Sequence, residues 1–108
     1  MPFSVFLTAD AVRDLEELYD YIDQHDAPGK AKRVLDRIEK TFNGLTESPE
    51  RGAYPKELLA LGVREYREVF FKPYRILYRV LNDAVYVYLI VDGRRDMQTL
   101  LQRRLLGG

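Results

Sequence analysis

The sequence has no cysteine and a single histidine. Without cysteine, the chain can form no disulfide bond, no thiolate metal site and no cysteine nucleophile. His25 lies among acidic residues at a predicted helix end, and the chain offers it no partners for a zinc site. We therefore expect no metal and no cofactor. The lack of cysteine is consistent with a cytoplasmic protein.

Several common sequence signals are also absent. The apolar runs are far shorter than the roughly 20 residues that cross a bilayer, so we expect no membrane segment. Residues 1–12 contain no basic stretch followed by an apolar stretch, which predicts no signal peptide. The chain has no Walker loop, no GxGxxG and no HExxH, so the common nucleotide-binding and zinc-protease motifs are excluded.

The length of 108 residues and the hydrophobic content of 46% predict one compact domain over residues 1–108. The net charge is zero, but it is unevenly distributed. Residues 1–54 carry seven basic and eleven acidic side chains, whereas residues 55–108 carry ten basic, eight of them arginine, and six acidic. This division suggests a surface for a protein partner or for RNA, unless ordinary surface charge has separated by chance.

The N-terminal half predicts a short strand followed by a helical hairpin. Residues 3–7 form an apolar run rich in β formers, expected to be a strand buried on both faces. Thr8 is a plausible N-cap for a helix that runs to about Gln24 and turns its acidic residues toward solvent. A second helix, with Asp26 as its expected cap, carries an unbroken apolar stripe over residues 31–45.

The C-terminal half predicts three strands and a short helix. The runs at 63–71, 73–81 and 84–91 are rich in β formers, and a tight turn at Asn82–Asp83 joins the last two. A final helix follows, with Asp96 as its N-cap. The order β-α-α-β-β-β-α predicts an α+β fold, in which a helical hairpin packs on one face of a small, mostly antiparallel sheet.

Arginine and tyrosine alternate along the strand at 73–81. Arg75 and Arg79 share one face, while Tyr74 and Tyr78 share the other. The tyrosine face is more apolar, so we expect it under the hairpin, with the arginines on an open face of the sheet. Such a face could bind RNA phosphates or an acidic partner. It could also be an ordinary solvent face, with arginine stems covering apolar residues.

The order and spacing of these segments resemble the RelE/ParE superfamily of bacterial type II toxins. The resemblance rests on "LTADAVRDLEELYDYI", "SPERG", "GVREY", "YRILYRV" and "DGRRDMQTLL", and it spans nearly the whole chain. It is closer to the ParE side, which includes the plasmid-stabilisation proteins. The resemblance implies a small cytoplasmic toxin that a cognate antitoxin neutralises. It also implies that the toxin meets operator DNA only through that antitoxin.

The same resemblance implies two alternative activities. RelE-type toxins cleave mRNA on the ribosome without a metal, whereas ParE-type toxins inhibit DNA gyrase and have no nuclease activity. The functional arginines of the family match Arg75 and Arg95. Two RelE lysines fall on Tyr66 and Glu68, however, and a RelE tyrosine falls on Leu101. A glutamate repels phosphate and leucine does no acid–base chemistry, so we expect the ParE-type activity.

Two alternatives to gyrase inhibition remain open. One is a ribosome-dependent mRNA endonuclease, which would use Arg75, Arg95 and Arg67. The other is a protein that has lost toxicity and only binds its antitoxin. In every case we expect the antitoxin to lie along the helical hairpin and the sheet edge. The candidate residues for binding the antitoxin or the target are Arg64, Arg67, Arg75, Arg79, Arg95 and Tyr74.

Overall fold

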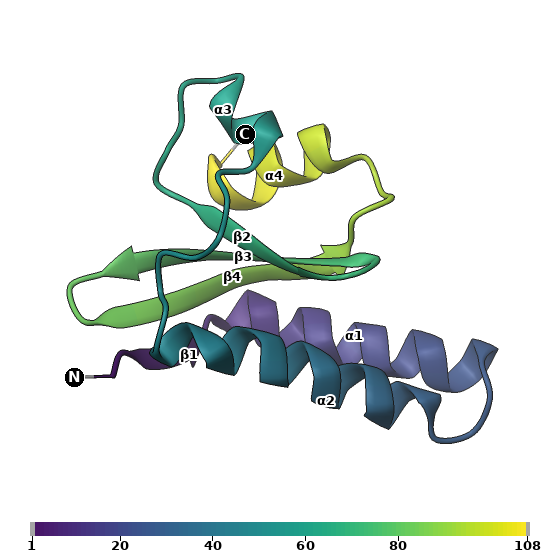
Figure 1. Cartoon of the computed structure of the whole chain (residues 1–108). Coiled ribbons are helices and arrows are strands. Elements are labelled where there is room, and N and C mark those ends of the chain that lie inside the picture. Colours follow the sequence, from purple (N-terminus) through teal and green to yellow (C-terminus); the bar gives the residue numbers. More distant parts are fainter. Residues whose placement is uncertain (1, 108) are drawn as a thin grey trace.

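The computed structural model describes residues 2–107, and its elements follow the expected order with two short additions (Figure 1). The N-terminal elements are β1 (Ser4–Leu7), α1 (Ala9–His25), α2 (Lys30–Asn43) and the 3-10 turn η1 (Gly44–Thr46). The remaining elements are α3 (Lys56–Leu59), β2 (Arg67–Phe71), β3 (Tyr74–Leu81), β4 (Ala84–Asp92) and α4 (Met97–Leu105). The additions are η1 and α3, which the sequence analysis did not predict.

The four strands form one sheet in the order β1-β4-β3-β2, in which only the β1–β4 pair is parallel. The expected mostly antiparallel sheet is therefore confirmed. Leu81 pairs with Ala84, so Asn82–Asp83 form the expected tight turn. Asn82 takes a φ of 57°, a conformation that asparagine tolerates better than most residues.

Strand β1 differs from its expected environment. It lies at the edge of the sheet, where Ser4 and Phe6 are exposed and Val5 and Leu7 are only partly buried. The expectation of a strand buried on both faces was wrong, because no helix of residues 2–107 covers the Phe6 side of this strand. No helix within residues 2–107 has both the length and the apolar character needed to cross a membrane.

The hairpin of α1 and α2 covers one face of the sheet (Figure 1). As expected, Thr8 caps α1, because its side-chain oxygen accepts a hydrogen bond from the Ala11 N–H at 3.1 Å. The sequence predicted Asp26 as the cap of α2, and this prediction was wrong. The Asp26 N–H donates to the Ile22 carbonyl and closes α1, and Gly29, with a φ of 83°, is the residue that precedes α2.

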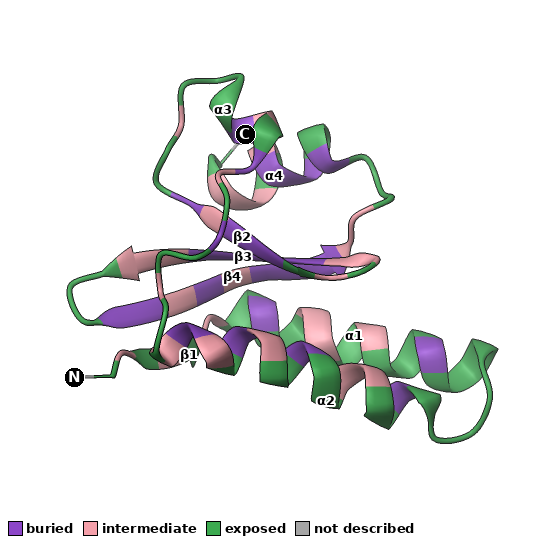
Figure 2. Ribbon diagram, in the orientation of Figure 1, coloured by how far each residue is buried: buried purple, intermediate pink, exposed green. Residues whose placement is uncertain are grey.

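Two hydrophobic cores lie on opposite faces of the sheet (Figure 2). The first, under the hairpin, contains Ile76 and Tyr78 of β3, so the expected burial of the tyrosine face is confirmed. The second joins Leu77 of β3 to Leu58 of α3 and Leu101 of α4. The expectation of an open arginine face was therefore wrong at Arg75, which lies under α3, whereas Arg79 lies toward the other end of β3 and is half-buried.

A β-bulge in β4 decides which side chains of this strand enter each core. The pairing of β3 with β4 shifts by one residue between Leu77 and Tyr78, which makes Tyr88 an extra residue in β4. Side chains therefore change faces on either side of the bulge. After it, Ile90 packs under the hairpin, while Leu89 packs under α4.

The backbone groups beside the bulge bind side chains from two distant helices. Asp14 of α1 accepts a hydrogen bond from the Ile90 N–H at 3.0 Å. Arg104 of α4 donates to the Tyr88 carbonyl at 3.1 Å and holds both Asp14 oxygens, at 3.1 and 2.9 Å. The Asp14 side chain is only 9% exposed. The expectation that the acids of the first helix all face solvent was therefore wrong for this residue.

We predict that Arg104→Met lowers the free energy of unfolding by about 2–3 kcal/mol, because Asp14 keeps its buried charge and loses its partner. Urea unfolding monitored by circular dichroism measures the change. Arg103→Met is the matched control, since Arg103 is the exposed neighbour of Arg104 on the same helix. Equal stability of the two variants would contradict the role of Arg104.

Candidate functional site

Arg75, one of the six predicted binding residues, is buried in an ion-pair cluster. Glu57 of α3 accepts hydrogen bonds from its two terminal nitrogens at 2.9 and 2.8 Å, and Glu68 of β2 accepts from Nε at 2.7 Å. The Arg75 side chain is 9% exposed. We call these three residues the Arg75 cluster. Each nitrogen of the guanidinium is already bound to a carboxylate of the same chain.

The two glutamates of the Arg75 cluster differ in their proton affinity. Hydrogen bonds from Arg75 lower the pKa of Glu57 below its ordinary value. Burial raises the pKa of Glu68, and this effect outweighs the opposing hydrogen bond from Arg75. Two carboxylates share one guanidinium, so the ionised cluster is negative. It is a poor site for a phosphate, because an approaching anion would meet both carboxylates.

Arg67 is also engaged with its own chain. Its guanidinium donates to the carbonyls of Glu50 and Gly52 at 3.2 and 2.9 Å and lies 4.6 Å from the centre of the Tyr54 ring. These contacts hold the loop before α3 against the sheet. Two of the six predicted binding residues, Arg67 and Arg75, are therefore engaged with other groups of the same chain.

The other predicted binding residues lie in two separate places. Arg64 precedes β2 and is exposed. Arg79 lies on β3 and is half-buried. Arg95 is exposed after β4, and Tyr74 is half-buried at the start of β3, where its ring stacks on Phe71. The six residues therefore do not form one site, and binding by these four stays a prediction.

Tyr74 and Arg95 line a groove of about 760 Å³ between the far end of the hairpin and the β2–β3 turn. We call it the hairpin groove. Tyr21, at its mouth, is 63% exposed. Lys72 and Arg95 form no ion pair within residues 2–107, whereas Lys30 and Arg94, on the same rim, are paired with aspartates. The apolar lining residues are Leu18, Ile22, Val34, Phe71, Pro73, Ile90 and Val91.

Sequence reasoning missed Tyr21, Lys72 and Glu57. A signal existed for two of them. Tyr21 is a large aromatic among the acidic residues of the first helix, and Glu57 follows Pro55 at the start of the short amphipathic run "KELL". No sequence signal joins Glu57 to Arg75, because 18 residues separate them. Within residues 2–107, no three His, Asp or Glu side chains group closely enough to hold a metal ion.

Comparison with known proteins identifies related toxins. The family model described as "ParE toxin of type II toxin-antitoxin system, parDE" matches residues 5–97. Toxin ParE3 of Caulobacter vibrioides is 28% identical over 91 residues, which cover 84% of this chain and 87% of that toxin. The family match includes the sheet except Ser4, the hairpin, α3 and the Arg75 cluster.

Solved structures share the fold at lower identity. A chain of the chromosomal ParDE system of P. aeruginosa aligns with a TM-score of 0.70 and 24% identity, covering 83% of this chain and 95% of that one. The RelBE2 toxin–antitoxin complex of Mycobacterium tuberculosis gives 0.56 and 23%, with coverage of 85% and 92%. An arginine mutant of free E. coli RelE gives 0.57 and 14%, with coverage of 97% and 100%.

We predict that Glu57→Gln destabilises the fold at neutral pH by about 2 kcal/mol, and Glu68→Gln by less. Glu57 is ionised and holds both terminal nitrogens of Arg75, so its charge contributes more. The charge of Glu68 is disfavoured by burial, and the amide keeps an acceptor for Nε. Urea unfolding of the two variants and wild type measures both changes. An equal loss of stability in the two variants would contradict this assignment.

Acidification should distinguish the same variants by the pH dependence of their stability. Glu57 has a lowered folded pKa, so its stabilisation is lost as the pH falls below about 4.5, its ordinary value. Glu68 has a raised folded pKa. Protonation of Glu68 therefore increases the free energy of unfolding as the pH falls from neutral toward 4.5, the ordinary value. Between pH 7 and about 4.5, Glu68→Gln should therefore lack a gain that wild type shows. If wild type and Glu68→Gln instead change in stability equally over this pH range, the raised pKa of Glu68 is contradicted.

Proposed function

The chain belongs to the ParE toxin family of type II toxin–antitoxin systems, and from this premise we propose that it arrests growth in the cytoplasm by inhibiting DNA gyrase. A cognate antitoxin neutralises it. Operator DNA is reached only through that antitoxin, and the toxin has no membrane partner. The Arg75 cluster is the observation that supports this activity over cleavage of mRNA.

Metal-free RNA cleavage needs cations that face the phosphate and groups that move protons. Arg75 has little exposure and two carboxylate partners, so it offers the phosphate neither open donors nor a positive field. Burial raises the pKa of Tyr66, so this hydroxyl stays neutral at physiological pH and supplies no positive charge to a phosphate. Leu101 is fully buried in the second core. Arg95 alone remains exposed among the candidate nuclease residues.

The antitoxin is proposed to bind in the hairpin groove. The ParDE and RelBE2 structures that share this fold are of toxin–antitoxin systems, which supports a protein partner for this chain. The groove presents an apolar lining and an exposed tyrosine, which together suit an amphipathic segment. Lys72 and Arg95 on its rim are available for carboxylates of that segment. This position replaces the expected antitoxin contact at Arg75.

We predict that the purified toxin, free of antitoxin, blocks DNA supercoiling by gyrase and leaves ribosome-bound mRNA intact. A supercoiling gel and primer extension on translated mRNA measure the two effects. Cleavage of mRNA in the ribosomal A site with normal supercoiling would favour the RelE-type alternative. The absence of both effects, together with normal growth on expression, would favour a protein that only binds its antitoxin.

We predict that Tyr21→Ser weakens binding of the antitoxin about tenfold or more, because exposed tyrosines in apolar sites often dominate binding energy. A short reading frame beside the toxin gene is the expected source of the antitoxin. Titration calorimetry with the purified pair measures the dissociation constant. Tyr19→Ser is the matched control, since Tyr19 is an exposed tyrosine of α1 that does not line the groove. Equal affinities would place the antitoxin elsewhere.

A further inference from the structure

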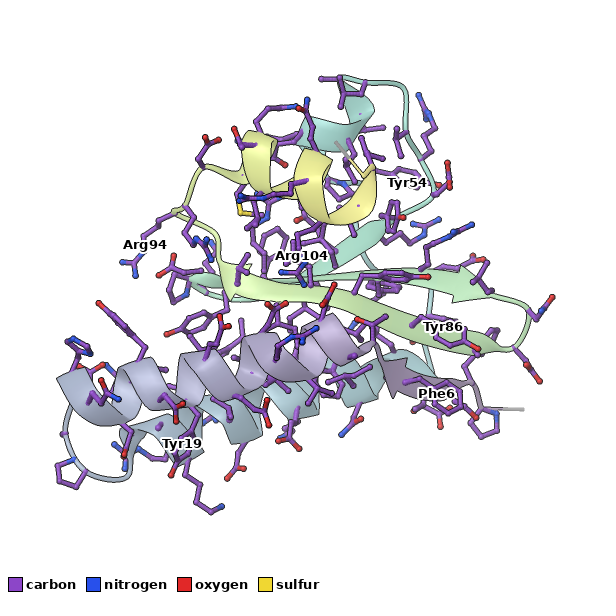
Figure 3. The ribbon with its side chains drawn as sticks, turned by 180° about the vertical axis from the view of Figure 1, so that it is seen from behind. Phe6, Tyr19, Tyr54, Tyr86, Arg94 and Arg104 are labelled. Atoms are coloured by element: carbon purple, nitrogen blue, oxygen red, sulfur yellow. The ribbon has the colours of Figure 1, made fainter. Side chains whose placement is uncertain are left out.

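The face of the sheet that α4 covers is open at its other end. There Phe6 of β1 lies beside Tyr86 of β4, and Tyr86 pairs with Arg79 of β3. These residues, with Leu81, form what we call the aromatic shelf. Figure 3 shows Phe6 and Tyr86 on the strand ends away from α4. Phe6 is 50% exposed, and its ring stacks on Tyr86 with 5.5 Å between centroids.

Arg79 gives the aromatic shelf a cation with donors to spare. Its guanidinium lies 5.7 Å from the centre of the Tyr66 ring, and its one ion pair within residues 2–107 is to Glu65, at 3.7 Å. Glu65 is itself 61% exposed, so this long contact holds neither side chain firmly. Tyr66 is fixed from behind by an edge contact with Tyr88. Arg79 is thus held by aromatic contact while its nitrogens can still bind a carboxylate.

The composition of the aromatic shelf favours a protein ligand over RNA. Tyrosine, phenylalanine and arginine are enriched in protein interfaces, where a few such residues carry most of the binding energy. A nucleic-acid surface would need several cations along a phosphate backbone. Here an exposed Glu65 lies beside Arg79, and an exposed Asp83 lies in the adjacent β3–β4 turn. The local charge is therefore mixed.

The aromatic shelf is also separate from the hairpin groove. The groove lies at the β2–β3 turn, whereas the shelf lies at the opposite end of β3, beside the β3–β4 turn. No shelf residue lines the groove. Substitutions in one surface can therefore leave the other intact.

We propose that the aromatic shelf is the surface that contacts the protein target of the toxin. The ligand is a segment of that target that places an apolar side chain against Phe6 and Tyr86 and a carboxylate on Arg79. This proposal rests on the proposed function only in that the toxin acts by binding a protein.

Two shelf variants test the proposal, the double substitution Phe6→Thr with Tyr86→Thr and the single substitution Arg79→Gln. Threonine favours strands and both aromatic side chains are at least partly exposed, so the fold should be retained. Growth arrest on expression and inhibition of purified gyrase should each weaken at least tenfold, with unchanged melting and unchanged antitoxin affinity. Phe70→Thr is the matched control, because Phe70 is a half-exposed strand aromatic outside the shelf.

Each other outcome identifies a different error. If wild type arrests growth and the shelf variants do so equally, the shelf proposal is wrong while the toxin assignment stands. If the shelf variants instead lose antitoxin affinity and remain toxic, the shelf belongs to the antitoxin. If they lose arrest together with mRNA cleavage on ribosomes, the ligand is RNA and the shelf proposal is again wrong. If wild type never arrests growth, both the proposed function and this inference fall.

Discussion

The bulge at Tyr88 is the constraint on which both layers of the structure depend. Strand β4 lies between β1 and β3 and contributes side chains to cores on both faces. A regular strand would turn Ile90 away from the hairpin, because side chains alternate between faces. The extra residue reverses the alternation, and Asp14 and Arg104 bind the backbone groups beside it. One side-chain network thus ties α1, β4 and α4 together.

Arg75 shows how the same residue can serve stability instead of anion recognition. An exposed arginine at this point of β3 would attract phosphate, whereas Arg75 is bound by two carboxylates from α3 and β2. The short helix α3 therefore has a role larger than its length. It contributes Glu57 to the cluster and Leu58 to the second core, and so closes a face that strand alternation alone leaves open. Burial of the guanidinium removes it from surface chemistry.

The surfaces that remain open lie at opposite ends of the sheet. One is the hairpin groove, with apolar walls and two cations, Lys72 and Arg95, that pair with no acid in the described part of the chain. The other is the aromatic shelf, with one loosely paired arginine. A toxin that must meet both an inhibitor and a target benefits from two contacts that can differ in chemistry. Strands β3 and β4 run from one surface to the other, so the sheet fixes the positions of both surfaces.

The sequence by itself determined the order of the elements, the hairpin, the tyrosine face under it, the Asn82–Asp83 turn and the family. These features follow from local periodicity, caps and turn residues, or from the spacing of segments along the chain. Tertiary structure alone decided that Arg75 is buried, that Asp14 faces inward and that α3 covers the sheet. Glu57 and Arg75 are 18 residues apart, and Asp14 and Arg104 are 90 residues apart. Charge pairing over such distances leaves no periodic pattern, because packing between distant segments creates it.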